Sequence, residues 1–279
     1  MKVSICGCGW LGLPLAKQLV RNGDSVFGSR REPCEAAKLV DFGIHGVALT
    51  LPLYLPDNDD DMTHLYSEFF DTDVLVINVP PGRGEGADER FIANVQSMSY
   101  AAQKYGCRRV IFISTTSVYG DVTGEVEEGT VPRPNTASGH AHWYIEQWLQ
   151  EQWGADVVIL RFAGLIGPGR HPVKFLSGRK GLINGSDPVN LIHLDDCIQA
   201  IGQITACWPS TNVLHLSAPS HPTRREYYTA MALTAGLPLP EFTDSPVSNA
   251  KVINGQHTCE ILDMTLQHPN LMLLAPELI

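Results

Sequence analysis

Lysine is scarce in this chain of 279 residues, which holds 7 lysines beside 13 arginines. Its 30 acidic side chains outnumber the 20 basic ones, so the formal charge is -10 at pH 7, and no run of the sequence concentrates positive charge. Nucleic acids and anionic membrane surfaces are bound through such concentrations. We therefore expect no nucleic acid and no membrane as a main partner, whereas a small anionic ligand can still bind locally.

Long apolar runs are absent as well. No stretch approaches the roughly 18 apolar residues of a membrane-spanning helix, and glycines interrupt the apolar segment at the start of the chain, which only superficially resembles a signal peptide. The 7 cysteines form an odd set scattered over apolar segments, unlike the framework of a small secreted disulfide protein. We expect reduced thiols, no metal site and a cytoplasmic location.

Short runs rich in valine and isoleucine alternate with helical segments. Runs that are apolar on both sides predict parallel strands buried under crossover helices. The sequence therefore predicts an α/β fold with a doubly wound parallel sheet. Strands are expected at 2–6, 25–29, 44–49, 73–79, 109–114 and 157–162, and helices at 11–21, 33–42, 62–70, 87–105 and 137–152.

The alternation breaks down in the last third of the chain, where glycine and proline become frequent. A further strand is expected at 213–217 and a helix at 224–235. We predict a dinucleotide-binding domain of residues 1–165, completed by the strand near 213–217, and a small discontinuous C-terminal lobe. This lobe comprises 166–212 and 218–279 and is expected over the carboxyl ends of the strands, where open α/β sheets bind ligands.

A glycine-rich loop, GCGWLG, joins the first strand directly to a helix. In this setting Gly7 permits a tight turn, Gly9 lets a pyrophosphate approach the backbone, and Gly12 lets helix and strand pack closely. The N–H groups at the helix start add phosphate donors. A structural glycine turn is the alternative, but the strand–helix–strand context predicts a dinucleotide site. Its loop residues are Gly7, Gly9, Trp10, Leu11 and Gly12.

The end of the second predicted strand indicates which dinucleotide is bound. An NAD site usually carries an acidic residue here, to accept a hydrogen bond from the ribose 2′-hydroxyl. This chain has Arg30 and Arg31 instead, followed only then by Glu32. Because a guanidinium suits a 2′-phosphate in charge and in geometry, we predict NADP(H) over NAD(H). The alternative is a pair of solvated surface arginines.

Three later segments carry a family resemblance: STTSVYG at 114–120, RFAGLIGPGR at 161–170 and LIHLDD at 191–196. Each is weak alone, but in this order they resemble the extended short-chain dehydrogenase/reductase family of nucleotide-sugar epimerases and dehydratases. The likeness covers nearly the whole chain and is greatest to the YeeZ-type bacterial branch, whose glycine loop also reads GxGxxG. It implies a Rossmann fold and an NAD(P)-dependent oxidoreductase, epimerase or dehydratase.

The resemblance also implies roles for single residues. Thr115 would bond a substrate oxygen, and Asn78 and Pro80 would line the adenosine and ribose of the cofactor. The turn 165–170 would pass the nicotinamide and reach, through Arg170, toward an anionic group of the substrate. The partner is then a small molecule that is anionic or similar to a nucleotide sugar. For Arg170, a surface salt bridge is the alternative.

The family carries its proton chemistry on a Tyr-x-x-x-Lys pair, which this chain lacks at the expected place. Glu146 matches the glutamate that follows the family's lysine by four positions. This register puts Ser138 in the tyrosine position and His142 in the lysine position. The one Tyr-x-x-x-Lys, at Tyr100 and Lys104, comes before the STTSVYG segment and cannot reach the catalytic face.

Three hypotheses follow, and the sequence leaves them open. In the first, the protein is an enzyme with a substituted centre that uses Thr115, Ser138 and either His140 or His142, since histidine titrates near neutral pH. In the second, it is an NADP(H)-binding sensor or regulatory protein without hydride transfer. In the third, Tyr144 enters the site from the same helix. Both histidines can also be ordinary solvated residues.

Family members pair two helices across a dimer interface, which would here be 87–105 and 137–152. The second of these carries Trp143, Trp148 and, just beyond it, Trp153. Their spacing suits one apolar face, buried either in the core or in a homodimer.

Overall fold

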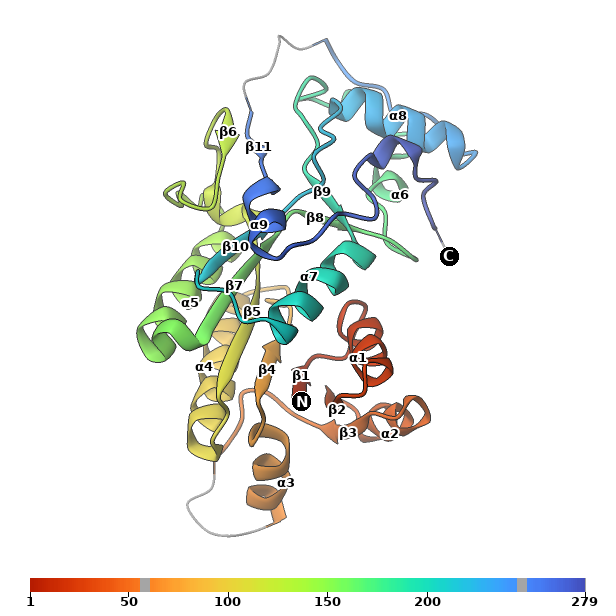
Figure 1. Cartoon of the computed structure of the whole chain (residues 1–279). Coiled ribbons are helices and arrows are strands. Elements are labelled where there is room, and N and C mark those ends of the chain that lie inside the picture. Colours follow the sequence, from red (N-terminus) through yellow and green to blue (C-terminus); the bar gives the residue numbers. More distant parts are fainter. Residues whose placement is uncertain (56–60, 245–249, 279) are drawn as a thin grey trace.

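Seven parallel strands form one central sheet (Figure 1) in a computed structural model that describes residues 1–55, 61–244 and 250–278. Side by side, the strands run in the order β10-β7-β5-β4-β1-β2-β3. All the predicted strands are present, and their ends differ from the expected ones by at most two residues. Their bounds are β1 (Lys2–Cys6), β2 (Ser25–Arg30), β3 (His45–Ala48), β4 (Val74–Ile77), β5 (Arg109–Thr115), β7 (Val157–Phe162) and β10 (Val213–Leu216).

The central strands are apolar on both faces because helices cover both faces. Along β4, Val74 and Val76 pack into one core, whereas Leu75 and Ile77 pack into another. The doubly wound α/β sheet of the Rossmann type is therefore confirmed. The first core lies under α1 (Gly12–Arg21) and α7 (Leu194–Ala206), and the second lies under α3 (Asp61–Phe70), α4 (Ala87–Tyr105) and α5 (Ala137–Trp153).

One predicted helix is shorter than expected, and one long helix was not predicted. The segment 33–42 is α-helical only over α2 (Pro33–Ala37) and continues as a 3₁₀ turn to Gly43, whose positive φ of 72° ends it. Helix α7 was not predicted, although Cys197, Ala200, Ile201 and Ile204 are buried at helical spacing. It falls in the range 166–212 that was predicted for the smaller lobe, yet it packs beside α1 on the sheet.

Short elements beyond the sheet form a smaller group of their own (Figure 1). Tyr227 and Met231 belong to a separate buried apolar cluster. The chain here forms two parallel strand pairs and a short helix that the sequence did not predict, together with the expected helix α8. They are β8 (Gly164–Ile166) with β9 (Leu191–His193), β6 (Glu125–Val126) with β11 (Val252–Ile253), α6 (Val173–Leu176) and α8 (Arg224–Thr234). The short helix α9 (Gln256–Ile261), also not predicted, packs against β10 and the first core.

The strand order places a crevice at the carboxyl end of β1. Because β1 lies between β2 and β4, the connections that leave β1 and β4 run to opposite sides of the sheet. This order brings Gly7, after β1, beside Asn78, after β4. Thr115 ends β5 in the same row. Within the described ranges, no helix has the length and apolar character needed to cross a bilayer.

Candidate active site

The glycine loop has the geometry of a phosphate-binding turn. Gly7 adopts a φ of 100°, and a β-carbon on it would lie 2.3 Å from the carbonyl oxygen of Asn78. A β-carbon on Gly12 would lie 2.2 Å from the carbonyl oxygen of Gly7. By contrast, a β-carbon on Gly9 would meet nothing within 4 Å. The loop is therefore packed closely on its inner side and open above Gly9, where a pyrophosphate could approach the backbone.

Arg30 ends β2 next to this loop. Its Nε is buried and has no hydrogen-bond partner among the described residues. Arg31 is exposed. Cys8, inside the loop, is fully buried, and this burial raises the pKa of its thiol to about 12 although the charge of Arg30 opposes the shift. Cys8 is thus a neutral packing residue, whereas Arg30 carries an unmet hydrogen-bond donor.

A cavity of about 510 Å³ opens at the carboxyl ends of β1, β4, β5 and β7. Its size is that of an ordinary small-molecule site. Most of the predicted site residues line it together: Gly9, Trp10, Leu11, Asn78, Pro80, Thr115, Ser138 and His142. Gly7 and Gly12 support the loop from behind, and Arg30 and Arg31 lie outside the cavity lining.

Thr115 places a hydroxyl group at the end of β5. Its Oγ1 accepts a 3.2 Å hydrogen bond from the Ser117 N–H and so caps the short 3₁₀ helix Thr116–Tyr119. That bond uses a lone pair of the oxygen and leaves its hydrogen free, because the described residues offer the hydroxyl no acceptor. Thr115 can therefore donate a hydrogen bond to a ligand oxygen in the cavity.

Ser138 and His142 face each other across one turn of α5. His142 Nδ1 lies 2.7 Å from the carbonyl oxygen of Ser138 and 3.4 Å from its Oγ. A carbonyl only accepts, so Nδ1 must carry the hydrogen and cannot withdraw the proton of Ser138. Burial lowers the pKa of His142, which packs on Phe91 with ring centroids 4.8 Å apart. His142 is thus neutral and does not replace the charge of a lysine.

The other groups considered from the sequence lie elsewhere. His140 and Tyr144 project from α5 into solvent, and 48% of Tyr144 is exposed. Tyr100 packs edge-on against Trp148 at 5.5 Å on the outer side of α4. Neither Tyr100 nor Lys104 lines the cavity, in agreement with their place in the topology.

Arg170 is the one formally charged residue among those that line the cavity. Its guanidinium lies 5.0 Å from the ring centre of Trp10, in the glycine loop. The indole N–H of Trp10 donates a 2.7 Å hydrogen bond to the carbonyl of Pro168. Arg170 has no ion-pair partner within the described part of the chain. The surface salt bridge that was the alternative for Arg170 is therefore not found among the described residues, and the glycine loop positions this cation.

A buried polar network anchors α5 behind the cavity. Glu146 accepts hydrogen bonds from Arg161 Nη2 at 2.6 Å and from the Ser114 hydroxyl at 2.5 Å. Burial raises the pKa of Glu146, and both bonds oppose that rise. Although burial disfavours the Arg161 charge, its bonds to Glu146 and Tyr119 raise the pKa of Arg161. A lone arginine in the apolar run VVILRF was the sequence signal for this pair, since buried charges need partners.

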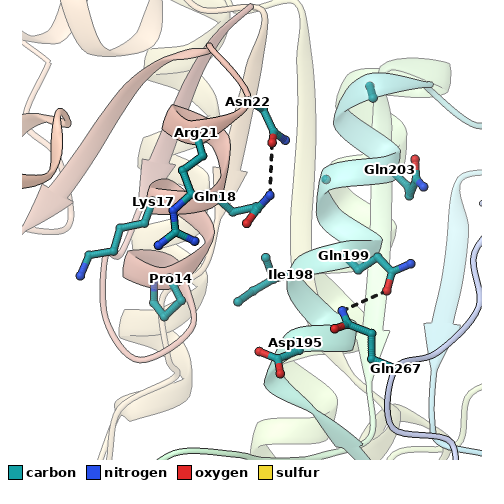
Figure 2. A pocket seen from close by; sticks show the side chains of 12 residues that line it. Pro14, Lys17, Gln18, Arg21, Asn22, Asp195, Ile198, Gln199, Gln203 and Gln267 are labelled. Atoms are coloured by element: carbon teal, nitrogen blue, oxygen red, sulfur yellow. Dashed lines mark hydrogen bonds between the residues drawn. The ribbon is translucent and has the colours of Figure 1, made fainter.

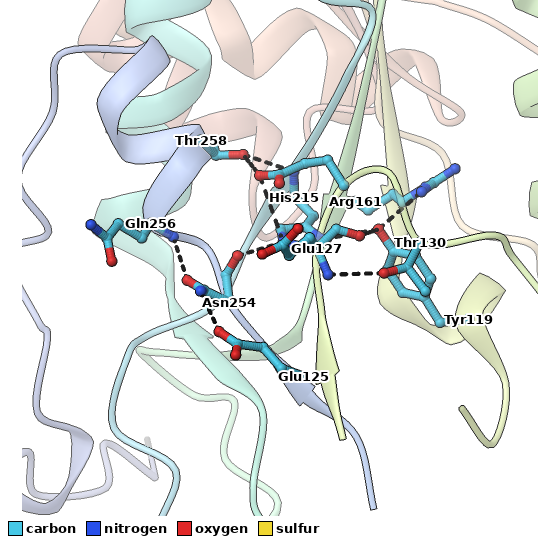
Figure 3. Close-up of polar contacts among 10 residues, drawn as sticks. Tyr119, Glu125, Glu127, Thr130, Arg161, His215, Asn254, Gln256 and Thr258 are labelled. Carbon is cyan, nitrogen blue, oxygen red and sulfur yellow. Dashed lines mark hydrogen bonds and ion pairs between the residues drawn. The ribbon is translucent and has the colours of Figure 1, made fainter. Parts of the chain in front are cut away.

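Figure 3 shows further contacts of this network, around Arg161, Tyr119 and His215. Arg161 Nη1 donates to the Tyr119 oxygen at 3.0 Å, and that hydroxyl lies 2.9 Å from His215 Nδ1. His215 Nε2 in turn lies 2.7 Å from the carbonyl oxygen of Asn254. Since that carbonyl only accepts, Nε2 carries the hydrogen and Nδ1 accepts from Tyr119. These contacts fix the strand ends that carry the site.

A polar hollow between α1 and α7 lies apart from this site (Figure 2). Its volume is about 560 Å³, and Lys17, Arg21 and Gln203 are among the residues that line it. Its lining residues come from α1 and α7, the residues next to these helices, and Gln267. No residue of the loop Gly7–Gly12 lines it. A dinucleotide held by the glycine loop would therefore occupy the other cavity.

His193, Asp195 and His268 lie close together where α7 meets the C-terminal segment. His193 Nδ1 accepts the Asp195 N–H at 3.3 Å and caps α7, and His268 Nε2 lies 3.1 Å from Asp195 Oδ2. A helix N-terminus favours negative charge, and the cap already uses the nitrogen that would face a cation. We assign this cluster to the attachment of the C-terminal segment.

Comparison with known proteins identifies the relatives of the chain. The sequence matches the NAD dependent epimerase/dehydratase family over residues 5–201. It is 39% identical over 279 residues to Protein YeeZ of Escherichia coli (strain K12), and the match covers 99% of each chain. The resemblance inferred from the motifs is therefore confirmed.

Solved structures share the fold. UDP-glucuronic acid 4-epimerase from Bacillus cereus, in complex with NAD, has a TM-score of 0.73 at 19% identity, over 96% of this chain and 92% of that chain. UDP-glucose 4-epimerase from Thermotoga maritima, with UDP-glucose, has a TM-score of 0.70 at 16% identity, over 96% of this chain and 94% of that chain. At these identities the likeness concerns the fold alone.

Proposed function

The chain belongs to the NAD-dependent epimerase/dehydratase family, and from this membership we propose that it binds NADP(H) and acts as an oxidoreductase or epimerase/dehydratase-like enzyme with substituted catalytic residues. The observation that carries the proposal is that one cavity is lined both by the glycine loop and by Thr115, Ser138 and His142. The proposed cofactor-binding loop and the candidate catalytic residues therefore face the same cavity.

The residues present suit a dinucleotide. The backbone is open above Gly9, and the buried Nε of Arg30 lacks a partner next to the loop. Gly9, Trp10 and Leu11 would hold the pyrophosphate, Asn78 and Pro80 would line the adenosine side, and Arg30 with Arg31 would bind a 2′-phosphate. When bound, the nicotinamide supplies hydride exchange with the substrate.

The residues of the chain would bind and orient the substrate. Thr115 would donate its free hydrogen to a substrate oxygen, and Ser138 offers a second hydroxyl from α5. The neutral His142 fixes the first turn of α5 through the Ser138 carbonyl. Arg170 would bind an anionic group, which favours a substrate with a phosphate or a carboxylate. The two epimerases above, one of which was solved with UDP-glucose, make a nucleotide sugar a reasonable first choice.

The cofactor preference is tested by Arg30→Ala and Arg31→Ala. We expect Arg30→Ala to lower the ratio of NADPH to NADH affinity by roughly tenfold, because a guanidinium–phosphate contact is lost. Arg31→Ala is expected to have a smaller effect, since Arg31 is exposed. Arg21→Ala, on the exposed end of α1, is the control. An unchanged ratio in both variants would exclude this assignment.

The enzyme is tested by turnover of NADP(H) with UDP-sugars and with small carbonyl compounds. Thr115→Val removes the free hydroxyl with little change in shape, and we expect a loss of about 100-fold or more in turnover with unchanged NADPH affinity. Thr234→Val, on the exposed face of α8, is the control. A Thr115→Val protein with full turnover would rule out this role.

A sensor or regulatory protein without hydride transfer is the second candidate. It is favoured by one observation, namely that the neutral His142 leaves no cation beside Ser138 to lower a hydroxyl pKa. This candidate predicts saturable NADPH binding, no turnover with any substrate of the panel, and no effect of His142→Ala on ligand binding.

Three further proposals complete this assignment. The lobe of residues 166–212 and 218–279 would select the substrate, while 1–165 with the strand near 213–217 would bind the cofactor.

The helices α4 and α5 would form the interface of a homodimer, because Tyr100 and Tyr144 are half exposed on them. Sedimentation of the protein and of Tyr144→Glu tests this contact. The cytoplasm is the proposed location.

A further inference from the structure

A separate hollow lies between the loop after β10 and the C-terminal segment around α9. Its volume is about 480 Å³. Pro219, Val252, Met264 and Leu266 give it apolar walls, and Cys259 of α9 also lines it. None of its lining residues is shared with the cavity that holds Thr115 and His142. The two spaces can therefore be occupied at the same time.

One nitrogen of an imidazole that lines this hollow has no hydrogen-bond partner among the described residues. His221 lines the wall, and its Nδ1 lies 2.9 Å from the carbonyl oxygen of Val189, which lies outside the lining. Since the carbonyl accepts, Nδ1 carries the hydrogen and Nε2 keeps a lone pair. Burial lowers the pKa of His221, so the ring is uncharged at neutral pH. No described residue donates to Nε2.

A second polar group lies at the same wall. Ser217 is 2% exposed, and among the described residues its hydroxyl has a single long contact, 3.4 Å from the carbonyl oxygen of Ala218. The opposite rim is fixed by Asn254, whose side chain donates to Glu125 Oε1 and whose Oδ1 accepts the Gln256 N–H. Glu125, Gln256 and Thr265 also line the hollow, so its rim is polar. Apolar walls beside an open imidazole acceptor suit a flat, mainly apolar molecule that carries one hydrogen-bond donor.

We propose that this hollow is a second ligand site, which binds a small planar apolar molecule through a hydrogen bond from the ligand to His221 Nε2. The apolar walls supply the affinity by burying the ring. The open acceptor of His221 favours ligands with an N–H or O–H on that ring. The site is independent of the proposed NADP(H) cavity, so its occupation does not require the cofactor.

Indole and 1-methylindole form the matched pair of probes, because they share the ring system and the methyl group replaces the N–H donor. We expect saturable binding of indole by saturation-transfer NMR or calorimetry, and roughly tenfold weaker binding of 1-methylindole, as for the loss of one buried hydrogen bond. The same affinities are expected with and without NADPH. Equal binding of both probes would overturn the role of His221, and no saturable binding of indole would overturn the site.

Two further measurements place the probe. Cys259→Phe fills the hollow and should abolish indole binding, whereas Cys34→Phe, at an exposed cysteine of α2, should not. In the unaltered protein, indole should slow maleimide labelling of Cys259, read by mass spectrometry, and leave labelling of the exposed Cys34 unchanged. This second measurement holds even if Cys259→Phe does not fold. Unprotected labelling of Cys259 at saturating indole would show that the probe binds elsewhere.

Discussion

Trp10 and Pro168 are joined by a 2.7 Å hydrogen bond from the indole Nε1 to the carbonyl oxygen, across 158 positions of sequence. The bond ties the glycine loop after β1 to the turn that carries Arg170. The Trp10 ring also lies under the Arg170 guanidinium, whose centre is 5.0 Å away. The face of the guanidinium is thereby occupied, while its N–H edge remains available to a ligand.

Trp10→Phe should weaken ligand binding in the cavity. The substitution keeps an aromatic ring but removes the N–H that bonds to Pro168, so the turn loses one anchor. We expect NADPH affinity to fall by a factor of about 3 to 10, as for one neutral hydrogen bond. Trp208→Phe is a close control, because Trp208 Nε1 donates to Ala155 at 3.0 Å and its ring lies 5.0 Å from Arg109. A titration in which both variants bind equally well would contradict the role of Trp10.

Gly12→Ala should disrupt the glycine loop itself. Its new β-carbon would lie 2.2 Å from the Gly7 carbonyl oxygen, so either the helix or the loop must move. We expect loss of measurable dinucleotide binding and destabilisation by about 2 kcal/mol or more. Gly202→Ala in α7 meets nothing within 4 Å and should stabilise by roughly 0.5 to 1 kcal/mol. Urea unfolding of both variants compares the two sites.

Glu146→Gln should be strongly destabilising. It removes the negative partner of Arg161, whose side chain is only 3% exposed, and leaves a buried charge uncompensated. The expected loss is about 3 to 5 kcal/mol in the free energy of unfolding. Glu241→Gln breaks an exposed ion pair with Lys180 and should cost less than about 1 kcal/mol. Similar unfolding midpoints for the two variants would show that the buried pair contributes little.

His171 should make the fold less stable in mild acid. Its Nε2 lies 2.9 Å from the Tyr227 hydroxyl, and burial lowers the pKa of His171 to about 4. The unfolded chain takes up a proton below about pH 6.5, whereas the folded chain resists it until about pH 4. The contribution of the neutral His171 to the free energy of unfolding is therefore fully present above pH ~6.5. It is lost as the pH falls toward 4, and the loss is on the order of 2 kcal/mol.

The measurement is the free energy of unfolding at several pH values for His171→Gln and for the unaltered protein. The variant should show a shallower decline between about pH 6.5 and 4. His140→Gln, at an exposed position of α5, should keep the full decline. Parallel curves for His171→Gln and the unaltered protein would mean that His171 is not the group responsible.

Local patterns in the sequence predicted the strands of the sheet and the glycine loop well. Strands such as β1 and β7 are apolar on both sides because both faces are buried, and a parallel sheet follows from that pattern. In the GxGxxG loop, Gly7 and Gly12 stand where a β-carbon would clash with a backbone carbonyl oxygen. The position of Glu146 put Ser138 and His142 in the family's tyrosine and lysine positions, and both residues line the cavity.

Other features could not be inferred from neighbouring residues. The charge state of His142 depends on its burial against Phe91 and on the direction of one hydrogen bond. The short strands β8 and β9 are three residues long and exist through pairing with each other. Helix α7 was missed although its apolar spacing was visible, because the surrounding glycines and prolines suggested loops.

The sequence by itself determined the strands of the sheet, the glycine loop and the replacement of the Tyr-x-x-x-Lys pair by Ser138 and His142, since each depends on residue type and on spacing along a single element. Only the tertiary structure decided that Thr115, Ser138 and His142 share a cavity with the loop, and that Arg170 lies over Trp10. The physical reason is that these contacts join segments up to 158 positions apart. The sheet order and the packing of the lobe create such contacts, and no local pattern encodes them.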